Sequence, residues 1–269
     1  MLTELDLNLR LLRGLPIEVQ GIKIYPVTID DIVNVTFEKY SRFLNLLCMD
    51  KENIKELGVL AEEINPFDFF YINSALNDSY KSLVFEALEF FLREKIGLYI
   101  CDIIEGIEKK RDFKLNDEQK KNIIIESIDS KGFYVGSIDD GKIINNDIFN
   151  EIVKIIKLQN CIVEKEEEEK IRPANERARK MLEQMRKNEE ELNKIKAKNA
   201  LTFHDLVSIF AAYSENTNIL NVWDLTFYQF NDQFNRLTIM KTYEANLQIL
   251  MHCDTSKNKI ELKHWLSNK

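Results

Sequence analysis

Glycine and proline, the residues that most often form tight turns, occur in this sequence only within residues 1–173. No glycine follows Gly141 and no proline follows Pro173, in a chain of 269 residues that holds 8 glycines and 4 prolines. Because these residues mark most turns, their scarcity argues against an all-β sandwich and against a loop-rich secreted scaffold. We therefore expect a mainly α protein whose C-terminal half consists of helices joined by short polar connections.

Charge divides the chain into three parts. Residues 1–163 contain 28 acidic and 20 basic side chains, and so carry the whole formal net charge of −8. Residues 164–199 contain 10 acidic and 11 basic side chains, and residues 200–269 contain 7 and 6. The sequence therefore predicts an N-terminal, mostly helical domain over 1–163, a charged linker helix over 164–199 and a helical C-terminal domain over 200–269.

Composition also excludes several classes of protein. A net charge of −8 argues against a general nucleic-acid binder, which needs a concentrated basic face. No apolar run reaches the roughly 18 residues that span a bilayer, and the N-terminus lacks the features of a secretory signal. The four cysteines are far apart among apolar neighbours, which is typical of buried free thiols. We expect a cytoplasmic protein that binds neither nucleic acid nor membrane.

Two short β-hairpins are predicted in the N-terminal domain. Residues 16–19 and 22–25 both alternate apolar and polar side chains around a Gln20-Gly21 turn. Residues 131–138 and 142–144 form a second such pair around Asp139-Asp140-Gly141. The predicted fold class is thus mainly α, with an α+β N-terminal domain that has two small β-hairpins.

Helix starts are marked by polar residues that cap the first turn. Thr28, three residues before Asp31, predicts one helix that continues to about Leu47. Asn65-Pro66 predicts the start of two core helices over 67–101, broken near Asn77-Asp78 or Gly97. Three further helix starts are predicted. One is at Asn116, and one is at Asn146, for a helix to about Asn160. The third is at Thr202, which lies three residues before Asp205 as in a capping box.

The charged linker contains a short heptad pattern. Its members follow at spacings of 3, 4, 3, 4 and 3, and are Ala178, Met181, Met185, Asn188, Leu192 and Ile195. A stable coiled coil needs more repeats than this. One interpretation is a solvated linker helix, and the other is a helix that oligomerises or binds a partner, in which Met181 and Met185 would be contact residues.

The sequence contains no pattern that indicates catalysis. It has neither a phosphate-binding glycine loop nor a nucleophile elbow. The histidines, His204, His252 and His264, lack the spacing of zinc ligands, and Asp139-Asp140-Gly141 lacks the later glutamate of a calcium loop. We therefore predict that the chain is not an enzyme and needs no metal or cofactor.

Aromatic residues gather between Trp223 and Phe234. They supply either apolar area for two or three short core helices or a surface for a partner, since Trp and Tyr dominate binding hot spots. We favour the core for Phe227, Phe230 and Phe234. The candidate partner-binding residues are Trp223, Tyr228, Tyr243, Trp265, Met181 and Met185.

Several segments resemble one family. The run 221–230 reads Asn-Val-Trp-Asp-Leu-Thr-Phe-Tyr-Gln-Phe, and it is followed by Tyr243-Glu244-Ala245-Asn246 and by Lys263-His264-Trp265. These, together with the hairpin 19–28, the helix that contains Glu38-Lys39-Tyr40 and the helix over 150–160, resemble the tail assembly chaperones of phages and prophages of Gram-positive bacteria.

The resemblance implies a non-enzymatic role in tail morphogenesis inside the host cytoplasm. Such chaperones coat the tape measure protein, keep it soluble, recruit tail tube subunits and leave before the particle is complete. A charged tether would raise the effective concentration of the C-terminal module. Two alternatives remain: a structural subunit of the tail, baseplate or connector, and a helical adaptor that forms a homo-oligomer through residues 174–198.

Overall fold

The computed structural model of the chain describes residues 3–49, 65–98, 119, 132–136, 142–162, 200–252, 264 and 266. The chain forms two compact units, one of residues 1–162 with 224–269 and the other of residues 163–223. The described residues are mainly helical with two small antiparallel sheets, which confirms the predicted fold class. The three-part division by charge stays a prediction, and the linker helix and the Asn116 helix start lie outside the described residues.

The first unit begins with a helix that the turn and capping signals did not reveal. Helix α1 (Glu4–Arg13) starts at Thr3, whose hydroxyl oxygen accepts a hydrogen bond from the N–H of Asp6. It ends at Gly14, which has φ +72° and whose N–H bonds back to the last turn. Glycine suits this left-handed cap because it has no Cβ to clash.

The first predicted hairpin is confirmed. Strands β1 (Ile17–Val19) and β2 (Ile22–Ile24) pair antiparallel, with Ile17 opposite Ile24. Gln20 and Gly21 both have positive φ, which is the backbone that a two-residue hairpin turn requires. The isoleucines and Val19 are buried, and Glu18 and Lys23 face solvent.

Two helices follow where one was predicted. Helix α2 (Ile29–Val35) starts at the predicted Thr28–Asp31 capping box, and α3 (Phe37–Leu47) starts at Thr36. Thr36 has φ +75°, which ends α2, and its hydroxyl accepts a hydrogen bond from the N–H of Lys39, which begins α3. The prediction of one continuous helix was wrong because this backbone reversal leaves no glycine or proline signal.

The predicted pair of core helices is confirmed, with its break at Asn77. Helix α5 (Pro66–Leu76) has Asn65 as its N-cap, and α6 (Asp78–Leu92) has Asn77, whose side-chain oxygen accepts from two N–H groups of the next turn. The segment after α6 is a strand rather than helix. Strand β3 (Ile96–Leu98) pairs antiparallel with β4 (Phe133–Val135), which in turn pairs with β5 (Ile143–Ile144).

Pairing of β4 with β5 confirms the second predicted hairpin, whereas β3 was not predicted. Gly97 in β3 stands opposite Tyr134 in β4, and a Cβ at Gly97 would overlap the tyrosine ring. Helix α9 (Asn146–Gln159) follows β5, with Asn145 rather than the predicted Asn146 as its N-cap. The side-chain oxygen of Asn145, rather than that of Asn146, accepts the hydrogen bond from the N–H of Ile148 in the first turn.

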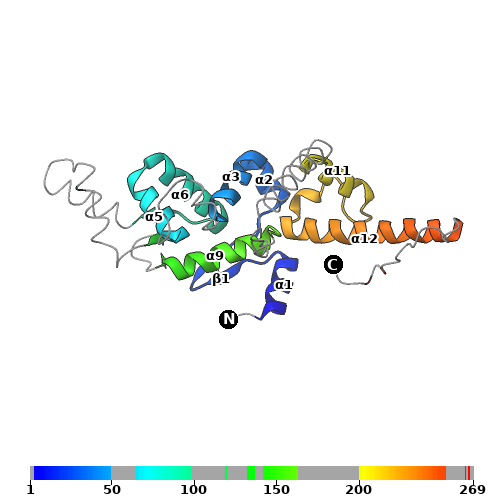
Figure 1. Cartoon of the computed structure of the whole chain (residues 1–269), viewed down its shortest axis with the longest axis horizontal. Coiled ribbons are helices and arrows are strands. Elements are labelled where there is room, and N and C mark those ends of the chain that lie inside the picture. The colour runs from blue at the N-terminus through cyan, green and yellow to red at the C-terminus, as the bar shows by residue number, and fades with distance from the viewer. Residues whose placement is uncertain are drawn as a thin grey trace, which may run out of the picture. The chain divides into compact units, whose positions relative to one another are not determined.

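Helix α9 runs alongside β1 (Figure 1) and also contacts α5, so it connects the first hairpin with the core helix α5. Aromatic rings fill the space between α5, β4 and α9. Phe67 lies 5.9 Å from Phe133 and 5.6 Å from Phe149, measured between ring centroids, and Phe70 lies 5.4 Å from Phe149. All four rings are buried.

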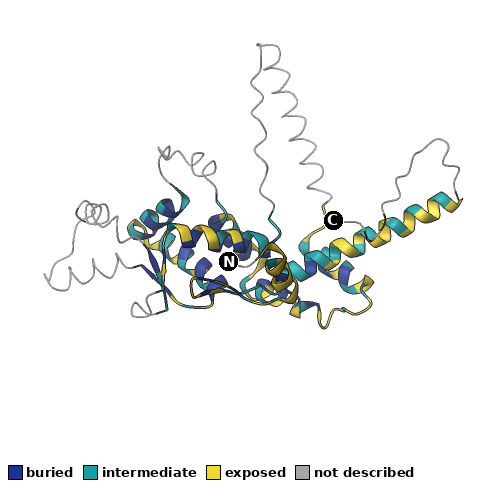
Figure 2. Cartoon of the chain, turned by 90° about the horizontal axis from the view of Figure 1, so that it is seen from below, coloured by how far each residue is buried: buried dark blue, intermediate teal, exposed yellow. Residues whose placement is uncertain are grey.

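The last described helix of the first unit is α12 (Phe227–His252), a single helix of 26 residues where two or three short ones were expected. Phe230 is buried, as predicted, whereas Phe227 and Phe234 are half-buried. The C-terminal part of α12 is a mixture of exposed and half-buried residues (Figure 2). No helix among the described residues is long and apolar enough to cross a membrane.

In the second unit, the structure describes residues 200–223. Helix α11 (Phe203–Tyr213) begins at the predicted capping box of Thr202 and Asp205 and buries Val207 and Phe210. Hydrogen bonding to Thr202 lowers the pKa of Asp205, because the carboxylate is the form that accepts these bonds. A short 3₁₀ turn, η3 (Val222–Asp224), ends the segment.

Candidate functional site

The segment 224–229, here called the docking segment, fixes the start of α12 to the N-terminal part of the first unit. Thr226 forms an antiparallel bridge with Thr28. The N–H of Ile29 donates to the carbonyl of Leu225 at 2.9 Å, and the N–H of Phe227 donates to the carbonyl of Val27 at 2.8 Å. The docking segment therefore adds a short strand-like contact beside the start of α2.

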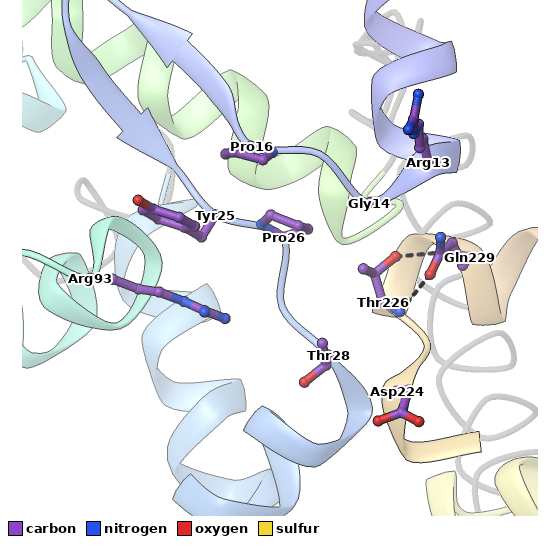
Figure 3. Close-up of a pocket in the computed structure, with 10 residues that line it drawn as sticks. All are labelled: Arg13, Gly14, Pro16, Tyr25, Pro26, Thr28, Arg93, Asp224, Thr226 and Gln229. Carbon is purple, nitrogen blue, oxygen red and sulfur yellow. Dashed lines mark hydrogen bonds between the residues drawn. The ribbon is translucent and has the colours of Figure 1, made fainter. Parts of the chain in front are cut away.

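Two side chains of the docking segment cap α12 (Figure 3). The N–H of Thr226 donates to Gln229 Oε1 at 2.9 Å, and the N–H of Gln229 donates to Thr226 Oγ1 at 3.2 Å. This is the reciprocal arrangement of a capping box. Gln229 Nε2 also donates to the carbonyl of Leu12 at 2.9 Å, which satisfies an acceptor at the end of α1.

Apolar contacts continue from the docking segment into the core. The ring of Phe227 lies 6.3 Å from that of Tyr40 on α3, and the ring of Phe230 lies 5.8 Å from that of Phe234. The structure therefore accounts for most of the motif Thr-Phe-Tyr-Gln-Phe at 226–230. Thr226 and Gln229 cap α12, and Phe227 and Phe230 pack against other aromatic rings. These residues hold α12 in place.

A buried polar pair lies next to this contact. The hydroxyl of Tyr40 donates to the side-chain oxygen of Asn160, and Asn160 Nδ2 donates to the carbonyl of Ile156 at 2.7 Å. Burial raises the pKa of Tyr40 far above its usual value, so its hydroxyl stays protonated.

Burial also raises the pKa of the Cys48 thiol to about 11, and Lys157 opposes that rise. Cys48 and Cys161 are free thiols, half-buried rather than buried; Cys101 and Cys253 lie outside the described residues.

A cavity of about 310 Å³ lies beside the docking segment (Figure 3). Arg93 points toward it, and its guanidinium pairs with Asp31 at 3.0 Å and lies 5.1 Å from the Tyr25 ring. The charge of this arginine is therefore already matched by a carboxylate. Among the described residues, no three His, Cys, Asp or Glu side chains gather as metal ligands would.

Three of the six candidate partner-binding residues are described. Trp223 is half-buried and its Nε1–H donates to the carbonyl of Ile219 at 2.6 Å. Tyr228 is half-buried, and burial, with a smaller effect of Cys161, raises its pKa. Tyr243 is half-buried, and its ring lies 5.4 Å from that of His264. Met181, Met185 and Trp265 lie outside the described residues.

Tyr228 and Tyr243 do not share one contact point. They stand 15 positions apart on α12, which corresponds to about 22 Å along a helix. Tyr243 instead belongs to an apolar face of α12 that consists of Met240, Tyr243, Leu247 and Met251, at spacings of 3, 4 and 4; Tyr243 is half-buried and the other three are exposed. Met240 is 42%, Leu247 39% and Met251 72% exposed. This set is called the α12 apolar face.

A second exposed set lies on α1 and was not predicted. Leu5, Leu9 and Leu12, at spacings of 4 and 3, follow one side of the helix and Leu15 follows it, and all four are exposed. This set is called the leucine stripe. Its spacing is the sequence signal that could have found it, since such spacing marks one helix face.

These features define a mainly helical protein in which two of the described helices, α1 and α12, carry exposed apolar side chains. The YomV second domain family matches residues 194–269, which include α11, the docking segment and the α12 apolar face. This family is associated with Bacillus phages and prophages, so the match supports a phage-related origin for the chain. No curated protein and no solved structure matches the chain.

Proposed function

We propose that this chain is a non-enzymatic phage tail assembly chaperone that binds the tape measure protein and recruits tail tube subunits in the host cytoplasm. The observation that carries the proposal is the α12 apolar face, which lies within the part of the chain that matches a phage-associated family. The resemblance of residues 221–230 and of the N-terminal hairpin to tail assembly chaperones adds the particular role.

The α12 apolar face suits a helical partner. Side chains at spacings of 3 and 4 form one continuous strip, and a second amphipathic helix buries its own apolar strip against such a surface. Two of the four members are methionines, whose unbranched side chains adapt to different partner surfaces. A chaperone that must cover many successive segments of one long helical partner benefits from such adaptability.

The docking segment supports the same role because it fixes only the first turn of α12. Hydrogen bonds from Ile29 and Phe227 and the capping pair hold residues 224–230. Beyond Phe230, no residue of α12 is buried. The rest of the helix is therefore presented by the folded unit rather than absorbed into its core.

Co-expression with the tape measure protein of the same phage genome tests the proposal. We expect the tape measure protein to remain in the soluble fraction and to co-purify with the wild-type chain. The variant Met240→Lys/Leu247→Lys should lose both effects, and Leu220→Lys, which changes an 84% exposed leucine elsewhere, should retain them.

Two results would overturn the proposal. One is a tape measure protein that is equally soluble without this chain and never associates with it. The other is recovery of the chain at stoichiometric amounts in mature particles, which would instead identify a structural subunit of the tail, baseplate or connector. Addition of purified tail tube protein to the co-purified pair tests the recruitment step in the same way.

A further inference from the structure

The leucine stripe on α1 faces away from the core of the unit that carries it. Leu5 is 69%, Leu9 55%, Leu12 42% and Leu15 37% exposed, whereas Leu11 on the opposite side is 1% exposed. Helix α1 therefore already satisfies its contact with the core through one apolar side and presents a second one outward. A helix that only needed to cover the core would carry polar residues there.

Charges of opposite sign flank the leucine stripe at its two ends. Asp6 lies in the first turn, and Arg10 and Arg13 lie in the last. These three residues, with Leu9 and Leu15, line one depression of about 280 Å³. Within the described ranges, no acidic side chain pairs with Arg10 or Arg13. One flank of the stripe thus has a negative end, a positive end and a hollow between them.

We infer that the leucine stripe is a homodimer contact, in which α1 of one chain packs antiparallel against α1 of a second copy. A two-fold interface joins the same patch on both subunits, so residue i meets j and residue j meets i. With the axis near Leu9, Leu5 of each copy lies opposite Leu12 of the other. Asp6 of each copy then lies on the same flank as Arg10 and Arg13 of the other.

Charge selects this arrangement over the parallel one. In a parallel two-fold pair, the flank of one helix that carries Asp6, Arg10 and Arg13 lies on the opposite side of the interface from that of its partner, so these charges do not meet. The antiparallel pair keeps the two flanks on one side and brings opposite charges together at both ends, which favours it. A second copy of this chain is therefore the occupant whose charges complement the flank at both ends.

The size of α1 sets the strength of the contact. A helix of 10 residues is about 15 Å long, so one pair of such helices buries less than the roughly 1,200 Å² at the lower end of stable interfaces. We expect a dimer with a dissociation constant between about 1 and about 100 μM. This inference does not depend on the proposed chaperone function, because it concerns the purified chain alone.

Sedimentation velocity of the full chain over a range of concentrations tests the contact. We expect a reversible monomer–dimer equilibrium in the wild type and at least a roughly tenfold weaker one in Leu9→Lys/Leu12→Lys. The matched control, Leu76→Lys, changes a 45% exposed leucine at the end of α5 and should dimerise like the wild type. A wild type that stays monomeric to about 200 μM, or a double variant that still dimerises like wild type, would overturn the inference.

Charge variants test the antiparallel arrangement separately. Asp6→Lys makes the flank wholly basic, and Arg10→Glu/Arg13→Glu makes it wholly acidic. Each variant alone should dimerise less than the wild type, and an equimolar mixture of the two should form mixed dimers, detectable when one carries a fluorescent label. Circular dichroism checks that both variants keep wild-type helix content. If the folded variants fail to form mixed dimers, the antiparallel pairing is wrong.

Discussion

Gln229 Nε2 donates a 2.9 Å hydrogen bond to the backbone carbonyl of Leu12, and these two residues stand 217 positions apart. The same side chain accepts from the N–H of Thr226 through its oxygen. A single amide thus closes the first turn of α12 and the last turn of α1. The position of α12 on the N-terminal part of its unit depends on this side chain and on the adjacent backbone bridge.

Replacing Gln229 tests that dependence. Gln229→Ala removes the capping acceptor and the donor to Leu12, so we expect the free energy of unfolding in urea to fall by about 1–3 kcal/mol. Gln233→Ala is the matched control, because Gln233 is exposed one turn further along α12 and bonds to the neighbouring Asp232. It should change stability by less than about 0.5 kcal/mol.

Gln229→Glu separates the two hydrogen bonds. Glutamate keeps an acceptor for the N–H of Thr226 but cannot donate to the carbonyl of Leu12. We expect an intermediate loss of stability, between those of Gln229→Ala and wild type. Equal stabilities of Gln229→Ala and Gln233→Ala would show that the Gln229 side chain does not help to hold α12.

Gly14 provides a second test of the same contact. Gly14→Ala and Gly21→Ala both force alanine into positive φ, +72° and +82°, at a cost of about 1 kcal/mol each. A Cβ at Gly21 meets open space, whereas one at Gly14 meets the Thr226 methyl at 3.1 Å. Gly14→Ala should therefore lower the thermal midpoint more than Gly21→Ala does. The reverse order would contradict close packing of the docking segment on Gly14.

The sequence predicts those features of the fold that depend on residues close together in the chain. The boxes of Thr28 with Asp31 and of Thr202 with Asp205 each lie within one turn, and the first hairpin depends on Gln20-Gly21. Long-range contacts have no such signal. Nothing near Gln229 indicates that its amide reaches Leu12, and the aromatic run around it was consistent with both a core and a binding surface.

The candidate site was predictable only in part for the same reason. Tyr243 was selected as an aromatic residue, and it lies on the α12 apolar face. Met240, Leu247 and Met251 were missed, because their exposure depends on where α12 leaves the core. The leucine stripe on α1 needed no such knowledge, since Leu5, Leu9 and Leu12 carry the spacing of one helix face.

Tyr40 tests the buried polar pair beside Phe227. Tyr40→Phe removes the donor to Asn160 and leaves a buried side-chain oxygen without that hydrogen bond, so we expect a loss of about 1–2 kcal/mol in urea unfolding. Tyr25→Phe is the control, because it also removes one hydroxyl but keeps the ring that lies 5.1 Å from Arg93. Equal effects of the two variants would mean that the Asn160 bond does not stabilise the fold.

Cys48 gives the protein a stability that depends on pH in the alkaline range. Burial raises the pKa of its thiol from 9.0 to about 11, so between these values the folded chain holds more protons at this site than the unfolded chain. The contribution of Cys48 to the free energy of unfolding is therefore complete below pH 9.0 and is lost as pH rises toward about 11. Urea unfolding of wild type and Cys48→Ala under reducing conditions, at pH values from about 8 to about 10, measures this loss. Cys48→Ala should lose stability less steeply over that range, and identical slopes would show that the thiol titrates alike in the folded and unfolded chains.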